Sequence, residues 1–247
     1  MRRFSDRRIF ALVCLNAALY VFILVFDSMK AACHISYTQG LVCDILKYIA
    51  IISCLFICVF ALSHERKKVA QIQMVVFCIT LGADFFLLFT NLFSTGVLIF
   101  IFAHACALLR YKPKWLLPIG IVAASLFVII MTVMRKALSA DIDIMLIVAA
   151  CVTYAILIIS VTISTFHAPQ PRLNEIFSRT GMLLFLACDV NVFIFNSVPA
   201  GAAPHTAAIV LMWLFYLPAQ TMLALSATSL PLINRRQADQ LQDSESI

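Results

Sequence analysis

The chain has 247 residues, of which 63% are apolar and 12% are charged, and its formal net charge is +6. A soluble domain usually carries about 25% charged residues. Here the charges lie in short clusters between apolar runs, each long enough to cross a hydrocarbon core of roughly 30 Å as a helix. The composition therefore excludes an ordinary soluble domain. No basic stripe with interleaved aromatic residues occurs, so nothing indicates nucleic-acid binding.

The apolar runs predict eight transmembrane helices joined by short loops into one bundle. The predicted spans are residues 9–26, 41–62, 70–90, 93–109, 115–134, 143–166, 179–198 and 206–229. We therefore expect an all-α, polytopic membrane domain over residues 1–233. Residues 234–247 are polar, which is typical of a disordered tail.

The positions of lysine and arginine predict the orientation of the bundle. With the N-terminus in the cytoplasm, fourteen of these residues lie on the cytoplasmic side, three lie on the other side, and Lys47 lies inside a span. Such an excess is typical of cytoplasmic loops, so both termini are expected in the cytoplasm. The bias fits a bacterial inner membrane or a eukaryotic endomembrane equally well. The first apolar run ends at Asp27 and not at small residues, so we expect a retained span rather than a cleaved signal.

Two features of the spans bear on cofactors and on helix shape. The nine cysteines form no CxxC pair and show no spacing typical of zinc ligands, so the sequence predicts neither a metal centre nor a disulfide framework. Pro218 lies within the last span, where it frees a backbone carbonyl and is expected to kink the helix.

A short internal similarity relates the third and seventh spans. Asp84 and Asp189 lie in these spans, and each is followed seven residues later by an asparagine, Asn91 or Asn196. Seven residues make about two helical turns, so each pair lies on one helix face. Both spans run from inside to outside in the predicted topology, which suggests a parallel internal repeat. Chance or shared apolar composition is the alternative explanation.

Polar side chains deep in the spans are the candidates for function. An ionisable side chain at a helix centre costs roughly 2.5–3.5 kcal/mol to insert. Counting along the predicted spans places six polar residues in the central and outer parts of the membrane, where they are candidates to line one pocket. They are Lys47, Asp84, His104, Asp189, Tyr216 and Gln220.

Structural interpretations of the same residues stay open. Asp84 is either a site residue or the partner of Lys47 in a buried ion pair that fixes helix packing. His104 is either a site residue or a neutral histidine bonded to a neighbouring carbonyl group. The two asparagines and Gln220 are either ligands or interhelical hydrogen-bonding residues.

The two aspartates are harder to explain as packing residues. If both face one cavity, burial and mutual repulsion leave one protonated and the other ionised near neutral pH. Such a pair can donate a proton with one group while the other stabilises a cation or activates water. Proton-coupled transport uses the same arrangement, so the pair alone does not separate an enzyme from a transporter.

Several short segments together carry a family resemblance. They are Lys47, Gly82-Ala83-Asp84, Gly96, Phe102-Ala103-His104, the stretch from Gly181 to Asp189, and Tyr216-Leu217-Pro218-Ala219-Gln220. In their order and spacing they resemble the YhhN-like family of multi-pass membrane proteins, which includes lysoplasmalogenases. The resemblance covers roughly residues 41–228.

This resemblance implies hydrolysis of the vinyl-ether bond of a lipid substrate, a lysoplasmalogen, to a fatty aldehyde and a glycerophospho-headgroup. It implies no metal or organic cofactor. Vinyl-ether hydrolysis suits two carboxyl groups, so Asp84 and Asp189 are the catalytic candidates. The substrate-binding candidates are Lys47 and His104 for the phosphate, Tyr216 and Gln220 for water or the glycerol hydroxyl, and also Asn91 and Asn196.

Two other functions remain open at this stage. A transporter or channel for a small solute would use the aspartates as proton or cation sites. A non-catalytic lipid-binding protein would need them only for stability. Release of aldehyde from a lysoplasmalogen distinguishes the hydrolase from both.

Overall fold

The computed structural model describes residues 2–32, 36–63, 66–90, 92–112, 114–137 and 142–228, with side chains described from residue 6 onward. Within these ranges the chain forms helices and no strand. The helices are α1 (Arg2–Ala31), α2 (Tyr37–Ala61), α3 (Lys67–Phe89), α4 (Phe93–Tyr111), α5 (Leu116–Ala137), α6 (Ile142–His167), α7 (Arg172–Ser197) and α8 (Ala203–Leu225). All eight are long and apolar enough to cross a membrane, which confirms the predicted spans. The predicted tail at 234–247 lies outside the described residues.

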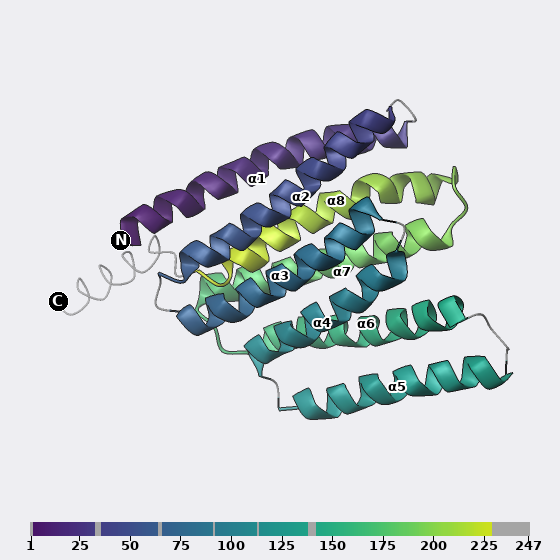
Figure 1. Ribbon diagram of the computed structural model, residues 1–247. Coiled ribbons are helices and arrows are strands. Elements are labelled where there is room, and N and C mark those ends of the chain that lie inside the picture. The colour runs from purple at the N-terminus through teal and green to yellow at the C-terminus, as the bar shows by residue number, and fades with distance from the viewer. Residues whose placement is uncertain are drawn as a thin grey trace.

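Six of the helices form a closed ring. In order around the ring, α2 packs on α3, α3 on α4, α4 on α6, α6 on α7, α7 on α8, and α8 on α2. Figure 1 shows the other two helices on opposite sides of the bundle, where α1 packs on α2 and α8 and α5 packs on α6. The ring therefore encloses side chains from helices that are distant in the sequence.

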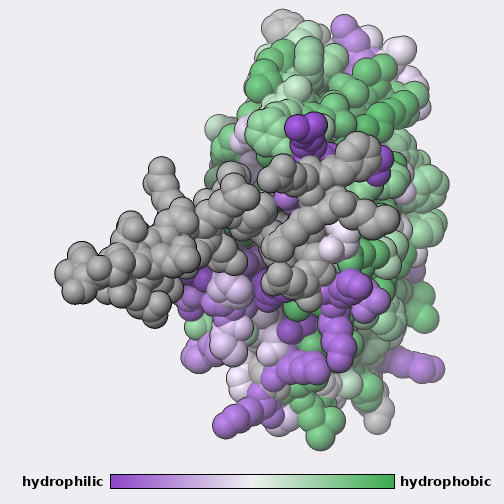
Figure 2. Space-filling model, turned by 90° about the vertical axis from the view of Figure 1, so that its left-hand side faces the viewer, coloured by the Kyte–Doolittle hydropathy of each residue, from purple (hydrophilic) through white to green (hydrophobic). Residues whose placement is uncertain are grey.

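The two ends of the bundle differ in what they expose. Figure 1 shows α1 beginning and α8 ending at the same end, which is called the N-terminal end below. Seen from that end, hydrophilic side chains gather over its surface, whereas the flanks are mostly hydrophobic (Figure 2). This is the distribution expected where a helical bundle leaves the hydrocarbon core and meets water.

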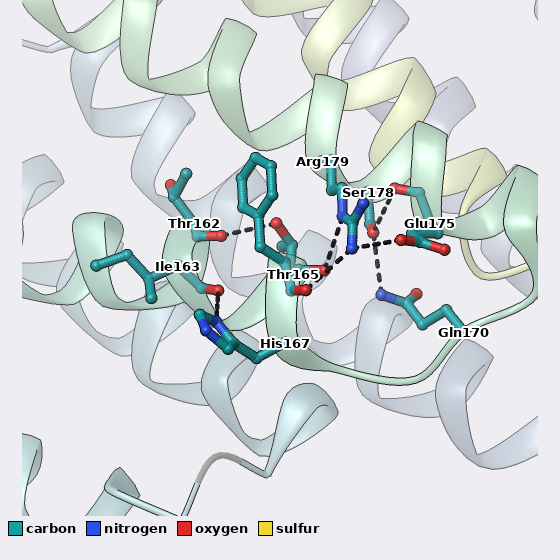
Figure 3. Close-up of polar contacts among 9 residues, drawn as sticks. Thr162, Ile163, Thr165, His167, Gln170, Glu175, Ser178 and Arg179 are labelled. Atoms are coloured by element: carbon teal, nitrogen blue, oxygen red, sulfur yellow. Dashed lines mark hydrogen bonds and ion pairs between the residues drawn. The ribbon is translucent and has the colours of Figure 1, made fainter.

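A polar cluster at the N-terminal end joins α6 to α7. The guanidinium group of Arg179 donates to the backbone oxygen of Phe166 at 2.9 Å and pairs with Glu175 one turn earlier (Figure 3). It thereby satisfies a carbonyl in the last turn of α6, which has no partner within that helix. Helix α7 begins at Arg172, seven residues before the predicted start at 179. The prediction was based on apolar residues and therefore did not include the polar first turns of this helix.

The earlier start of α7 places the two deep aspartates at the same depth. Asp84 lies 17 residues after Lys67, the first residue of α3, and Asp189 lies 17 residues after Arg172, the first residue of α7. Both residues are therefore in the half of the bundle away from the N-terminal end. The internal repeat stays a prediction.

Helix α1 is attached to the ring by buried hydrogen bonds. The amide nitrogen of Asn16 donates to the Cys54 sulfur at 3.2 Å and to the Thr221 hydroxyl at 3.3 Å, and the Ser53 hydroxyl donates to the Asn16 amide oxygen. These bonds link α1 to α2 and α8 at once. Interhelical polar bonds of this kind fix helix rotation in a solvent that offers no hydrogen bonds.

The carbonyl group that Pro218 leaves without its helical donor has a hydrogen-bond partner on another helix, which the sequence does not reveal. Helix α8 continues through Pro218, which has no N–H to donate to the carbonyl group of Leu214 one turn earlier. The Tyr20 hydroxyl of α1 donates to that oxygen at 3.0 Å. A side chain from another helix therefore satisfies the carbonyl that the proline leaves free.

Two of the motif glycines lie where helices approach closely. A Cβ atom at Gly96 would come within 2.7 Å of Leu87 atoms, and one at Gly181 would come within 3.2 Å of the Ala219 backbone oxygen and 3.0 Å of Leu223. These positions bring α4 onto α3 and α7 onto α8, and the backbones can approach closely only without a side chain. These two motif glycines thus serve packing.

Replacing Gly181 with leucine should loosen the contact between α7 and α8. Overpacking costs about 2 kcal/mol, which for a chain of this size lowers the unfolding midpoint by roughly 5 °C. The measurement is thermal unfolding of the purified protein in detergent. Gly120→Leu is the control, because a Cβ atom there meets nothing within 4 Å. Equal midpoints for the two variants would contradict the packing role.

Candidate functional site

A cavity of about 320 Å³ lies inside the helix ring and is called the main cavity below. Its polar lining includes both deep aspartates together with Tyr154 and Tyr216. Its apolar wall comes from α3, α4, α7 and α8 and includes Leu87, Val97, Phe100, Val192, Ile209 and Met212. The cavity thus combines a long apolar wall with a small convergent set of polar groups, which is typical of a ligand site.

Each aspartate in the cavity accepts a hydrogen bond from a tyrosine on another helix. The Tyr216 hydroxyl lies 2.9 and 2.8 Å from the two carboxyl oxygens of Asp84, and this bond joins α8 to α3. The Tyr154 hydroxyl donates to Oδ2 of Asp189 at 2.7 Å and joins α6 to α7. The main cavity therefore contains two separate Asp–Tyr pairs.

The two pairs differ in exposure. Asp84 is buried, with 4% of its surface accessible, whereas Asp189 is partly exposed. Both oxygens of Asp84 face the one hydroxyl of Tyr216, but only one oxygen of Asp189 is bonded to Tyr154. Asp189 is accordingly the carboxyl group that a bound molecule reaches more easily.

Aromatic rings hold the two tyrosines in place. The ring of Phe185 lies 5.4 Å from that of Tyr216, and the ring of Phe100 lies 6.2 Å from that of Tyr154, both in edge-on geometry. Phe185 and Phe100 also contact each other edge-on at 6.2 Å. Edge-to-face packing at these distances is favourable, so the hydroxyl groups are presented from a fixed aromatic layer.

Lys47 is paired, but with a residue that the sequence analysis did not select. Its ammonium nitrogen lies 2.7 Å from Oδ1 of Asp27 and 3.7 Å from Oδ1 of Asp44. It also lies 5.0 Å from the centroid of the Trp213 ring. The alternative in which Lys47 pairs with Asp84 is therefore not what the structure shows. Lys47 still lines the main cavity.

Asp27 was predicted only as the end of the first span, yet it is fully buried against Lys47. Together with Lys30 and Asp44, these residues form the polar end of the main cavity, near the end of α1 and within the first half of α2. Two carboxylates and two ammonium groups balance in formal charge. The polar end is therefore neutral overall rather than a cationic patch.

The remaining predicted site residues are separated by the structure. Asn196 lines the main cavity, but its amide donates to the backbone oxygen of Val192 at 2.7 Å. Asn91 lies outside the described residues. His104 and Gln220 line a second, smaller cavity and not the main one. Nδ1 of His104 lies 3.0 Å from the Phe100 backbone oxygen, which fits the carbonyl-bonded alternative.

Sequence reasoning missed Tyr154 and Asp27 for different reasons. Tyr154 carries one polar atom in a mostly apolar span that also contains several serine and threonine hydroxyl groups, so its position at mid-span was the one available signal. Asp27 lies close to a predicted span end, where an exposed carboxylate is ordinary. Within the described ranges, no group of three or more His, Cys, Asp or Glu side chains is arranged to hold a metal ion.

Replacing Asp27 with asparagine should destabilise the protein, because it leaves the Lys47 charge without its nearest partner. Breaking a buried pair costs about 3 kcal/mol, whereas removing both charges costs much less. The double variant D27N/K47M should therefore recover most of the stability lost in D27N. Chemical unfolding in micelles measures the free energy of unfolding of both variants. Lys68→Met, at an exposed lysine, is the control. Additive losses in the double variant would show that the two residues are not coupled.

Comparison with known protein families identifies a family for this chain. The family model of the YhhN family matches residues 43–227, a range that contains both Asp–Tyr pairs and Lys47. The match begins after α1, so Asp27 lies outside it. No curated protein and no solved structure matches the chain.

Proposed function

The chain belongs to the YhhN family, and from this membership and the geometry of the main cavity we propose that it is a membrane hydrolase of the lysoplasmalogenase type. It would cleave the vinyl-ether bond of a lysoplasmalogen to a fatty aldehyde and a glycerophospho-headgroup. The observation that carries the proposal is the presence of two Asp–Tyr pairs on one cavity with an apolar wall.

The shape of the cavity suits a single-chain lipid. The apolar wall takes the start of the alkenyl chain, where burial of each CH₂ group contributes about 0.8 kcal/mol. The polar end, with its two lysines and two aspartates, receives the headgroup. The vinyl-ether bond, which joins chain and glycerol, is then positioned between these parts, beside the aspartates.

The exposure of the two aspartates suggests their roles. We assign Asp189 as the general acid, because an acid that protonates carbon must contact the substrate and Asp189 is the more accessible carboxyl group. We assign Asp84 as the carboxylate that stabilises positive charge. Both of its oxygens face the Tyr216 hydroxyl, which donates to them and leaves Asp84 as an acceptor.

The proposed reaction proceeds in three steps. The Asp189 carboxyl group transfers its proton to the β-carbon of the vinyl ether, and the double-bond electrons form the new C–H bond and leave an oxocarbenium ion opposite Asp84. Water adds to the α-carbon and gives a proton back to Asp189. The resulting hemiacetal then loses the glycerol oxygen, which takes the hemiacetal proton, and the aldehyde is released.

The excess of lysine and arginine in some loops suggests from which side of the membrane the lipid would enter. With the N-terminal end in the cytoplasm, as the lysines and arginines suggest, the main cavity lies in the half of the membrane away from the cytoplasm. The lipid would therefore enter from that leaflet of a bacterial inner membrane or a eukaryotic endomembrane.

Replacing either aspartate should slow aldehyde release. Asp84→Asn and Asp189→Asn should each lower aldehyde release by about 10³-fold or more, because each removes an acid–base or charge-stabilising group. Tyr154→Phe and Tyr216→Phe should lower it roughly 10- to 100-fold, because Tyr216 donates to the Asp84 carboxylate and Tyr154 donates to the carboxylate that forms at Asp189 when its proton is transferred. The assay is aldehyde release from a lysoplasmalogen by purified protein in detergent.

The matched control is Asp143→Asn, which replaces an exposed aspartate in the first turn of α6 and should leave the rate unchanged. Full activity of both the Asp84 and the Asp189 variants would exclude the two-carboxylate reaction. Absence of aldehyde in the unaltered protein, together with solute flux in liposomes, would favour a transporter instead.

The assignment of roles is tested by chemical rescue. Acetic acid added to Asp189→Ala should restore aldehyde release in proportion to its undissociated form, because the missing group is a proton donor. For Asp84→Ala the restoration should follow acetate, because the missing group is a carboxylate. Measuring rescue across pH at fixed total acetate separates the two, and an exchanged pattern would reverse the assignment.

A further inference from the structure

A second cavity lies behind the aromatic layer of the site and is called the rear cavity below. Its accessible space is about 20 Å³, and it is enclosed by α3, α4, α6, α7 and α8. Phe185 lies in its wall and packs edge-on against Tyr216 of the main cavity. The rear cavity is therefore a separate space on the other side of the ring that supports Tyr216.

The lining of the rear cavity is polar for a site within a membrane bundle. Gln73, Thr80, His104 and Gln220 all line it, and at most 5% of the surface of each is exposed. Buried polar groups in proteins almost always have a hydrogen-bond partner, from the protein or from an ordered water. Each buried polar atom of these side chains therefore needs a hydrogen-bond partner.

The side-chain amide of Gln220 is the clearest case. The residue is 2% exposed, and its Nε2 atom has no hydrogen-bond partner among the described residues. An amide NH₂ group carries two donors and no acceptor. Gln220, which lines the rear cavity, thus carries a buried donor that requires an acceptor.

His104 supplies the complementary group. Its Nδ1 atom lies 3.0 Å from the Phe100 backbone oxygen, and since a carbonyl oxygen only accepts, Nδ1 carries the hydrogen. In a neutral imidazole the other nitrogen, Nε2, is then an acceptor. No described residue is hydrogen-bonded to Nε2. The two residues that carry this donor and this acceptor, Gln220 and His104, line the same space.

The size of the rear cavity decides what completes this pair. One water molecule needs about 10–15 Å³ of accessible space and two to four polar partners. The rear cavity offers about 20 Å³, which fits one water and no larger ligand. We propose that the rear cavity binds one water molecule, which accepts a hydrogen bond from Gln220 Nε2 and donates one to His104 Nε2.

This water joins two helices of the ring. Gln220 follows Tyr216 by one turn on α8, and His104 follows Phe100 by one turn on α4. A water between them links α8 to α4 across Phe185 of α7, directly behind the rings that support the two tyrosines. Gln220 and His104 then hold the site from behind, and neither touches the substrate.

The test is solid-state NMR of the protein in liposomes with ¹⁵N-labelled histidine. The wild type should show His104 with hydrogen on Nδ1 and with magnetisation transferred from water to Nε2. A His104→Gln spectrum assigns the signal. Gln220→Met, which keeps the shape but removes the donor, should abolish at least nine-tenths of the transfer.

His167 provides an internal control in the same spectra. Its Nδ1 atom lies 3.0 Å from the Ile163 backbone oxygen, as in His104, but the residue is exposed (Figure 3). Its water transfer should be unchanged in every variant. A lost His167 signal would reveal general misfolding.

A second variant keeps both polar partners and removes the space. Ala107 lines the rear cavity, and Ala107→Val fills part of it. Loss of water transfer to His104 in this variant is expected. Absence of transfer in the wild type, or undiminished transfer in both variants, overturns the proposal. These spectra need no substrate, so their outcome is independent of the aldehyde assay.

Discussion

The cost of an unpaired polar group in hydrocarbon shapes the polar contacts between the helices of this bundle. Helices satisfy their own backbones, but a side-chain carboxylate, amide or ammonium group within a span has no water to bond. Asp84 therefore bonds to Tyr216, Asp189 to Tyr154, and Lys47 to Asp27. Even the carbonyl that Pro218 leaves free has a partner in Tyr20. Each of these bonds joins two helices, so the polar residues fix which helices meet and in which rotation.

The number of helices could be predicted from the sequence because length and apolar composition suffice for it. The hydrogen-bond partners of the buried polar side chains could not be predicted, because they depend on how each helix is rotated about its axis. The mostly apolar span that contains Tyr154 does not define this rotation, so nothing in the sequence marked Tyr154 as the partner of Asp189. Lys47 and Asp84 are both deep enough to pair, yet Asp27 of α1 lies nearer to the lysine. The depth of a residue along a helix can be counted from the sequence, whereas the direction in which its side chain points around the helix axis cannot.

The same limit explains why the predicted site divides between two cavities. Asp84, Asp189, Lys47 and Tyr216 line the main cavity, as their depth suggested. Gln220 is only four residues beyond Tyr216, but one turn moves a residue about 6 Å along the axis. That step crosses the layer of Phe185, so Gln220 lies in the rear cavity with His104. Membership of a motif therefore does not imply contact with the same ligand.

Helix α1 gives the cavity a feature that the family match does not include. The two Asp–Tyr pairs lie within residues 43–227, whereas Asp27 lies before them in α1. Because Asp27 pairs with Lys47, a residue outside the matched region determines how much of that lysine's charge a ligand can use. The chemistry proposed for the aspartates and the electrostatics of the polar end thus depend on separate parts of the chain. Changes in α1 would therefore alter the charge balance of the polar end while the Asp–Tyr pairs stay as they are.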